Sequence, residues 1–511
     1  MRRLVLWLSL ALSLSVGAVC QAASTPIAGT NIRATDRGNK AYRLDLESAR
    51  SAYDKRDFDN ACRLYQRLVA DRQASRLSPP ERRALYSGAG LAMRQCDRPA
   101  LALKYLQRAT REVADPFDYF YLALVADEAG RHALAREVYI EYIQRWPEAA
   151  DESDTELVWS LYRASSGRPD EQRRLLQAMF DADFEDPVAN TSPLWFELVR
   201  LHLDRGDLDR ARQTAQRVTA LDSIIRMRVD RRFDPIMDHA SGTFDAMQLA
   251  ERAIEIQLKK VDARPDDLAA WVELTYALLD ADRNDDVIAI ATSLLDASDP
   301  DKPRNEKDPE FIKLDMRLWL MNNRALALYR EGRLREAVED LQRAVRSTTG
   351  DQINVSQTLN LGVMTCRAGY PQQAIEAVRT VGQMSDYGKI VLAMVHLCAA
   401  KQLKDPAGVE SALDRVRAHA SEHPSALIDA LVWAERLDEA EQLYLRLLDD
   451  PEDRADALLA AQTFVAADHL PVVQARQQTW QALLARPAVR EAIERVGRVE
   501  SFPIRSGHDY D

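Results

Sequence analysis

The sequence predicts an all-α protein built as a solenoid of helix-turn-helix repeats, and three observations lead to this prediction. Alanines that open second helices recur at steps of 33 to 41 residues, at Ala61, Ala102 and Ala135, and again at Ala337 and Ala374. Gly (18) and Pro (21) are too sparse in 511 residues for a protein rich in tight β-turns. Hydrophobic residues make up 46% of the chain, which is enough to bury a core along a long array.

The charge balance narrows the possible functions. The chain carries 68 Lys+Arg against 80 Asp+Glu, so its net charge is -12. Such a balance provides no general attraction to phosphate backbones or anionic lipid, and it disfavours nucleic-acid binding. The length corresponds to two to four ordinary domains or to one long repeat array.

The first 22 residues predict a secretory signal peptide. Arg2 and Arg3 precede an apolar run over residues 4–19, and cleavage is expected after Ala22. The run is short for a helix that spans a membrane, so an uncleaved anchor is the disfavoured alternative. Lipidation at Cys20 is also disfavoured, because the residues before it fit a lipobox poorly. The pattern is typical of bacterial export and predicts a periplasmic protein.

Several windows share one residue pattern, which is clearest at residues 195–221. There Trp195 lies on a first helix, Gly206 and Asp207 form the turn, and Ala211 opens a second helix. Small residues let the two helices approach closely, and each hairpin leaves an apolar face that only the next hairpin covers. Comparable windows lie at 49–68, 90–109, 123–147, 271–294, 321–345, 361–381 and 427–447, with degenerate units at 155–180 and 390–418.

This pattern resembles the tetratricopeptide repeat, a helix-turn-helix unit of about 34 residues. The resemblance implies a right-handed α-solenoid, here in two blocks, that binds protein partners. A generic helical bundle with Ala and Leu at helical spacing is the alternative.

Breaks in the pattern divide the chain into segments. A charged stretch around Arg226 and Arg232 interrupts the repeat, and Gly497 is a favourable residue for ending the last helix. The expected segments are the signal peptide at 1–22, a flexible leader at 23–39, a tetratricopeptide-like block at 40–222, an irregular connector with one long helix at 223–267, a second such block at 268–450, capping helices at 451–500 and a tail at 501–511.

Four cysteines follow the signal peptide, and their spacing predicts two disulfides. Cys62 and Cys96 are 34 residues apart, and Cys366 and Cys398 are 32 residues apart, which is about one repeat in each case. An even count in an oxidising compartment permits the pairs Cys62–Cys96 and Cys366–Cys398. Buried free thiols are the alternative.

The sequence carries no recognised catalytic or cofactor motif. It lacks G-x-S-x-G, H-E-x-x-H, G-x-x-x-x-G-K-[ST], G-x-G-x-x-G and C-x-x-C. His419 and His423 have the i, i+4 spacing of metal ligands, but no Glu or Cys nearby completes a site. The basic run at 226–232 is expected to pair with local Asp residues, with an anion-binding patch as the alternative. We therefore predict no enzyme, cofactor or metal.

The family resemblance implies a concave groove, lined by the first helices of successive repeats, that holds a peptide or a partner helix. Aromatic, Asn and Arg side chains at such positions suit the recognition of an extended chain. In the second block these positions predict a partner-binding groove lined by Tyr276, Trp319, Asn322, Leu326, Tyr329, Leu359, Val363 and Arg367.

The resulting functional prediction is a non-catalytic protein-binding scaffold or adaptor in the bacterial cell envelope, in assembly, secretion or polymer export. That setting is drawn from family analogy. The alternative is a solenoid that binds a glycan or cell-wall polymer. The sequence indicates neither the identity of the partner nor the oligomeric state.

Overall fold

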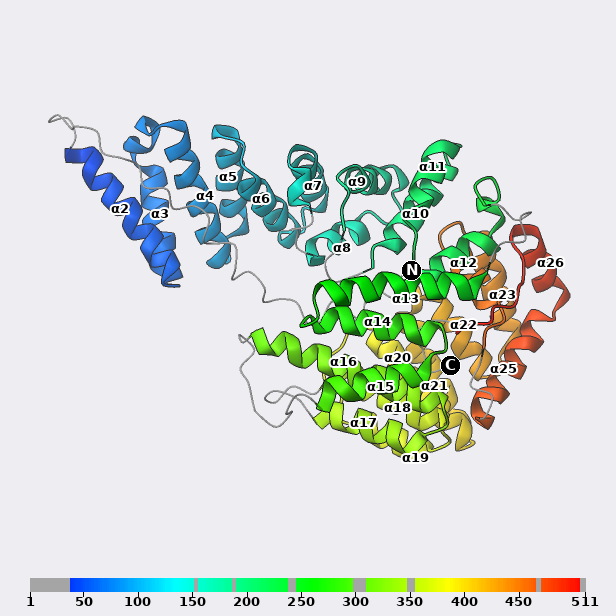
Figure 1. Ribbon diagram of the computed structural model, residues 1–511. Helices are drawn as coiled ribbons and strands as arrows, with labels where there is room; N and C mark the ends of the chain where they lie inside the picture. The colour runs from blue at the N-terminus through cyan, green and yellow to red at the C-terminus, as the bar shows by residue number, and fades with distance from the viewer. Residues whose placement is uncertain are drawn as a thin grey trace. The chain divides into compact units, whose positions relative to one another are not determined.

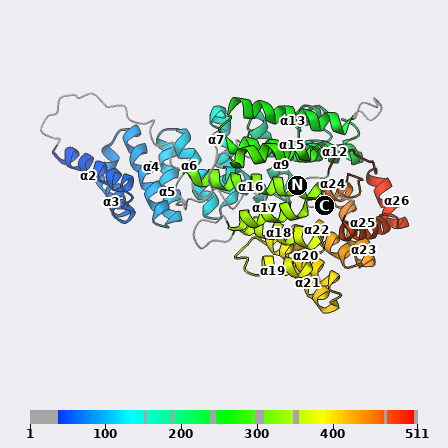
Figure 2. The ribbon, with the colours of Figure 1, turned by 60° about the horizontal axis from the view of Figure 1, so that its bottom comes forward.

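The computed structural model describes residues 37–150, 155–185, 190–237, 245–296, 309–346, 354–465 and 470–505. These residues form 25 α-helices, labelled α2 to α26, and four short 3-10 helices (Figures 1 and 2). Their only β-type pairings are two isolated bridges. The predicted all-α solenoid is confirmed. The predicted signal peptide and residues 23–36 of the predicted leader lie outside the described residues.

The chain divides into two compact units whose boundary falls between Leu201 and His202. We call their described residues the N-terminal unit and the C-terminal unit. The boundary lies inside α10 (Ser192–Leu203), whereas the sequence led us to expect it near residue 222. Residues 202–222 fall in the C-terminal unit, in which the guanidinium of Arg212 donates to the carbonyl of Pro235 (3.3 Å).

From residue 37 to residue 164 each helix of the N-terminal unit packs against the next one along the chain, which is the arrangement of stacked hairpins. Two short 3-10 helices, η2 (Arg72–Arg76) and η3 (Pro147–Ala149), connect successive hairpins. The helices are α2 (Arg37–Asp54), α3 (Phe58–Ala70), α4 (Pro79–Gln95), α5 (Pro99–Glu112), α6 (Pro116–Glu128), α7 (His132–Arg145), α8 (Thr155–Ala164), α9 (Pro169–Asp181) and most of α10.

In the C-terminal unit one large hydrophobic cluster includes residues from Leu221 to Ile504, and a smaller one includes Trp319 and Leu320. The long helix expected in the connector is present as α13. The helices are α11 (Leu208–Ala215), α12 (Leu221–Val229), η4 (Arg231–Phe233), α13 (Ala246–Ala263), α14 (Leu268–Asp280), α15 (Asn284–Asp296), α16 (Pro309–Arg330), α17 (Leu334–Arg346), α18 (Val355–Arg367), α19 (Pro371–Val378), α20 (Asp386–Gln402), α21 (Pro406–His419), η5 (Ala420–Glu422), α22 (Pro424–Trp433), α23 (Leu437–Asp449), α24 (Arg454–Ala460), α25 (Pro471–Leu484) and α26 (Pro487–Val496).

Left-handed residues at the turns and small residues at the crossings explain why this sequence forms hairpins. Gly130, Gly332 and Gly369 have φ values of 69°, 74° and 89° at the turns that follow first helices. Glycine adopts this conformation without steric cost. At the crossing of α18 and α19, a Cβ added to Gly362 would lie 2.5 Å from the Cγ1 atom of Val378. Backbone approach at this crossing therefore requires the smallest residue.

The end of the chain is an ordered part of the core. Residues 501–505 were expected to belong to a polar tail, but Phe502 is 4% exposed and Ile504 is 1% exposed. The backbone amide of Phe502 donates to the carbonyl of Thr463 (2.8 Å), and that of Val465 donates to the carbonyl of Ile504 (3.0 Å). Side chains two residues apart on an extended segment share one face, which is why both apolar residues enter the core.

The same terminal segment binds the charged stretch that follows α12. The amide of Arg498 donates to the carbonyl of Val229 (3.0 Å), and its guanidinium pairs with Asp234 (2.8 Å). Arg228 in turn pairs with Glu500 (2.6 Å). We call residues 226–234 together with 497–505 the terminal clasp. The basic run at 226–232 thus pairs with acidic residues of the same unit, as the sequence led us to expect.

Gly497 is expected to be essential for the terminal clasp, for a reason other than helix capping. Helix α26 ends at Gly497, as expected, and the φ of this residue is -160°, which is ordinary extended backbone. A Cβ at this position would lie 2.5 Å from Leu458 and 2.6 Å from the carbonyl oxygen of Val229. The substitution Gly497→Ala should lower the free energy of unfolding by about 1–3 kcal/mol through overpacking.

Urea unfolding of the protein checks this, with Gly382→Ala as the control. A Cβ at Gly382 meets nothing within 4 Å, so this control should leave the midpoint nearly unchanged. Equal midpoints for the two variants would contradict the close approach at Gly497.

Candidate functional site

The structure places most of the predicted groove residues in the interior of the C-terminal unit. Only Tyr276, Val363 and Arg367 are partly exposed. The predicted residues do not together line an open groove. Helix α14 packs against α16, and α18 packs against α20, so the side chains that face each other lie between the helices. The buried members are Trp319 (9% exposed), Asn322 (4%), Leu326 (0%), Tyr329 (0%) and Leu359 (3%).

Asn322 belongs to a buried chain of hydrogen bonds that joins three first helices. The amide of Asn360 on α18 donates to the side-chain oxygen of Asn322 on α16 (2.7 Å). The amide of the neighbouring Asn323 donates to the hydroxyl of Thr275 on α14 (2.9 Å), and that hydroxyl donates to the carbonyl of Val272 (2.7 Å). Satisfied buried networks of this kind fix how neighbouring helices align. The polar residues that suggested partner recognition therefore hold the repeats together.

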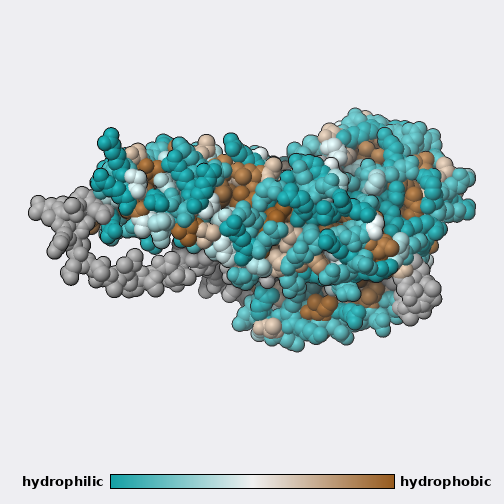
Figure 3. Space-filling model, turned by 90° about the horizontal axis from the view of Figure 1, so that it is seen from above, coloured by the Kyte–Doolittle hydropathy of each residue, from teal (hydrophilic) through white to brown (hydrophobic). Residues whose placement is uncertain are grey.

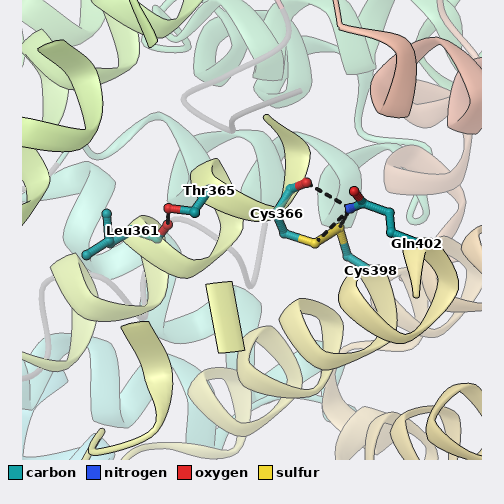
Figure 4. The surroundings of a disulfide bond; sticks show 5 residues. All are labelled: Leu361, Thr365, Cys366, Cys398 and Gln402. Carbon is teal, nitrogen blue, oxygen red and sulfur yellow. Dashed lines mark hydrogen bonds between the residues drawn. A yellow bond between two sulfur atoms is a disulfide. The ribbon is translucent and has the colours of Figure 1, made fainter. Parts of the chain in front are cut away.

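The four cysteines pair as the sequence predicts. Cys62 and Cys96 form one disulfide, with 6.8 Å between their Cα atoms, and Cys366 and Cys398 form the other, with 6.4 Å. Figure 4 shows the second pair, where the amide of Gln402 donates to the carbonyl of Cys366 (2.8 Å) and lies 3.1 Å and 3.3 Å from the two sulfurs. Each bond joins successive hairpins within its own unit. Disulfides of this kind suit an oxidising compartment.

Loss of the disulfides should destabilise each unit separately. They close loops of 34 and 32 residues, for which loop-closure entropy gives about 3–4 kcal/mol each. We expect dithiothreitol to lower the thermal midpoint of the protein. In the Cys62→Ala/Cys96→Ala variant, dithiothreitol should lower the thermal midpoint by a smaller amount, because only the Cys366–Cys398 disulfide remains to be reduced. A midpoint independent of reductant in the wild-type chain would contradict both bonds.

The remaining chemistry-bearing residues do not converge on one site. Within the described ranges, no group of three or more His, Cys, Asp or Glu side chains could hold a metal ion. His419 lies 3.3 Å from Asp386, whereas His423 packs its ring against Tyr387. A pocket of about 240 Å³ near the ends of α20, α22 and α25 is lined mainly by apolar atoms of residues such as Val432, Trp433 and Val472. No helix in the described part of the chain is long and apolar enough to cross a membrane.

His396 on α20 should make the stability of the C-terminal unit depend on pH. Burial, reinforced by the charge of Arg415, lowers the pKa of His396 below its ordinary value of 6.5. The unfolded chain therefore binds a proton more readily, so this contribution to stability is complete above pH 6.5 and is lost as the pH falls below it. We expect a decline in thermal midpoint between pH 7 and pH 5 that is shallower in His396→Gln. Identical slopes would contradict the assignment.

The surface itself has no single apolar band on the face drawn in Figure 3, where hydrophobic residues form separate patches in a mainly hydrophilic surface. Contacts between side chains indicate a candidate site more clearly than this surface does.

An aromatic row that the sequence analysis missed lies on α6 of the N-terminal unit. Phe117 and Tyr121 pack with ring centroids 4.6 Å apart, and Phe120 lies 5.3 Å from Tyr121. All three side chains are partly exposed.

Neighbouring polar groups hold this row in place. The carboxylate of Asp115 caps α6 by accepting from the amide of Phe117 (3.1 Å). Asp118 is fully buried and accepts from the guanidinium of Arg83 (2.6 Å). Burial raises the pKa of Asp118, although Arg83 opposes the shift. The sequence signal that could have revealed the row is the run of four aromatic residues at 117, 119, 120 and 121 on a first helix.

One comparison with known protein families covers this region. The family model of the tetratricopeptide repeat matches residues 46–119, from within α2 to the start of α6. The predicted resemblance is confirmed over these residues. The chain is also similar to two crystal structures at 12% identity each. One is yeast Tom70, with 81% of this chain and 99% of that chain covered and a TM-score of 0.23. The other is the APC/C hetero-tetramer Cut9-Hcn1, with 89% and 95% covered and a TM-score of 0.27. No curated protein sequence matches the chain.

Proposed function

We propose that this protein is a non-catalytic scaffold or adaptor of the bacterial cell envelope, acting in assembly, secretion or polymer export. Tetratricopeptide repeats generally mediate contacts between proteins, and residues 46–119 match that family. Two disulfides and the amino-terminal sequence favour an exported protein. The occupant of its binding surface is a peptide or a partner helix.

The aromatic row on α6 is the observation that carries this proposal. First helices line the concave surface of such repeats, and α6 is a first helix that keeps Phe117, Phe120 and Tyr121 partly exposed. Partly exposed aromatic rings on a rigid helix supply contact area at little entropic cost, as in the energetic centres of protein interfaces. The buried set on α16 and α18 offers no comparable surface. We therefore assign the primary binding surface to α6.

A capture experiment tests this assignment. Mature protein on beads is incubated with envelope extract, beside Phe117→Ala/Tyr121→Ala and beside Tyr370→Ala. The control removes an aromatic side chain that is 49% exposed elsewhere in the chain. We expect a protein that the wild type and the control capture and the double variant loses, with all three chains equally helical. Equal capture by all three would exclude the α6 surface.

Binding of a glycan or cell-wall polymer is the second candidate, and the clustering of aromatic rings at α6 favours it. The same beads distinguish the two. Retention of polysaccharide in place of protein, lost in the Phe117→Ala/Tyr121→Ala variant, would establish the polymer as the ligand.

A further inference from the structure

Positive charge is concentrated at one end of an otherwise acidic chain. Residues 37–113, which form the first two hairpins, contain 17 Lys+Arg against nine Asp+Glu, whereas the whole chain has a net charge of -12. Exposed charges contribute little to the stability of the folded protein, even when they form ion pairs. Stability therefore does not explain the excess of Lys and Arg on these two hairpins. The structure shows where part of this excess gathers.

Four exposed arginines lie on two segments, the η2 loop and the end of α5. Arg72 and Arg76 lie on η2, and Arg108 and Arg111 lie in the last turns of α5. The side chain of Arg82 connects the two elements, because it donates both to the carbonyl of Leu77 (2.7 Å) and to Glu112 (2.7 Å). We call Arg72, Arg76, Arg108 and Arg111 the arginine patch.

The four guanidinium groups of the arginine patch are available to a partner. All four residues are exposed, and none forms an ion pair within the described part of the chain. The acidic residues closest in sequence are already used, since Glu112 pairs with Arg82 and Asp71 caps η2 by accepting from the amide of Gln73 (2.8 Å). Arg108 and Arg111 stand near the negative end of the helix dipole of α5, which favours a positive charge there. This does not explain the positive charges of Arg72 and Arg76 on η2.

The surroundings of the arginine patch are rigid and partly aromatic. The guanidinium of Arg108 lies over the ring of Tyr86, 5.5 Å from its centroid. The Cys62–Cys96 disulfide joins the two hairpins that carry the patch. A surface that is already ordered loses little entropy when a partner binds. The planar fork of arginine pairs with carboxylates through two parallel hydrogen bonds.

We propose that the arginine patch docks an acidic segment of a partner protein, rich in Asp and Glu. That the partner is a protein rests on the proposed function. That its docking segment is acidic rests on charge complementarity with the arginine patch. The patch lies within the residues that match the repeat family. It adds an electrostatic contact to the aromatic one on α6, and such contacts increase association rates and select partners.

The probe is a fluorescein-labelled peptide that alternates Glu and Gly over sixteen residues, titrated with full mature protein at low salt. The test variants are Arg72→Gln/Arg76→Gln and Arg108→Gln/Arg111→Gln. The matched control is Arg63→Gln/Lys104→Gln, which removes the same charge from exposed positions of the same hairpins. We expect each test variant to weaken binding about tenfold and the control to weaken it less than twofold. Salt should abolish the difference.

Several results would overturn the proposal. Equal loss of affinity in the test and control variants would show a general charge effect without a site. Tighter binding to polyphosphate or to vesicles of phosphatidylglycerol than to the peptide would point to an anionic polymer or a lipid surface. If the molecular mass in solution increased with protein concentration for the wild type but not for the arginine patch variants, the partner would be a second copy of this chain.

Failure here is distinguishable from failure of the proposed function. The arginine patch variants could bind the acidic peptide normally while the Phe117→Ala/Tyr121→Ala variant still fails to capture its protein. That result would exclude the arginine patch and leave the scaffold proposal supported. If the peptide binds through the patch but no envelope protein is captured, the scaffold proposal fails on its own.

Discussion

Replacement of Asp340 by alanine is expected to be among the most destabilising single changes in the C-terminal unit. Asp340 is 2% exposed and accepts two hydrogen bonds from Arg324, at 2.6 Å and 2.9 Å. Arg324 itself is 8% exposed and also donates to Thr292 (3.0 Å), so it connects α15, α16 and α17. Without the carboxylate, a buried guanidinium keeps its charge and loses its counter-ion, which costs about 3–5 kcal/mol.

Hydrogen exchange of the whole protein measures this effect. We expect amides of α16 and α17 to lose protection in Asp340→Ala, and the urea midpoint to fall. Arg343→Ala is the control, because Arg343 also contacts Asp340 but its side chain is 57% exposed. The double variant Arg324→Met/Asp340→Leu should recover most of the loss, since an apolar pair of similar size replaces a buried ion pair at little cost. No recovery would contradict the unpaired charge as the cause.

Removal of residues 499–511 is expected to open the terminal clasp and destabilise the C-terminal unit. The deletion removes Phe502 and Ile504, whose burial contributes about 1.5–3 kcal/mol each. It also removes Glu500 and Arg505, the partners of Arg228 (2.6 Å) and Asp282 (2.6 Å). Exchange should therefore rise both in residues 226–234 and around Thr463, two segments more than 200 residues apart in the chain.

A shorter deletion provides the control for this experiment. Removal of 506–511 leaves every contact described for the terminal clasp in place and should not change the exchange pattern. If both deletions behaved alike, the clasp would not contribute to stability. If the longer deletion affected residues around Thr463 but not 226–234, the pairing of Arg228 with Glu500 would not hold the two segments together.

The repeat architecture could be predicted from local residue patterns. Ala211, Ala337 and Ala374 were chosen as crossing residues from spacing alone, and all three are fully buried. This succeeds because each hairpin is a local structure, in which a small residue at a crossing and a left-handed residue at a turn are needed whatever lies further away. The disulfides follow for the same reason, because repeat spacing brings equivalent positions of adjacent hairpins together.

The candidate site was harder to predict, as Asn322 and Tyr329 show. Both lie on a first helix at positions that the family resemblance assigns to a concave surface, yet they are 4% and 0% exposed. Exposure of a first-helix residue depends on how tightly the next repeat packs against it, and no single repeat contains that information. The aromatic row on α6 was missed because a run of aromatic residues in the sequence does not show which rings stay partly exposed in the fold.

The sequence by itself determined the fold class, the positions of most helices and the pairing of the cysteines, because these follow from interactions within one repeat or between neighbours. The tertiary structure alone decided the unit boundary, the burial of the predicted groove residues and the role of residues 497–505. Each of these depends on contacts between distant segments, such as Arg498 with Asp234. Periodicity carries no signal for contacts between residues so far apart in the chain, so only the packed structure reveals them.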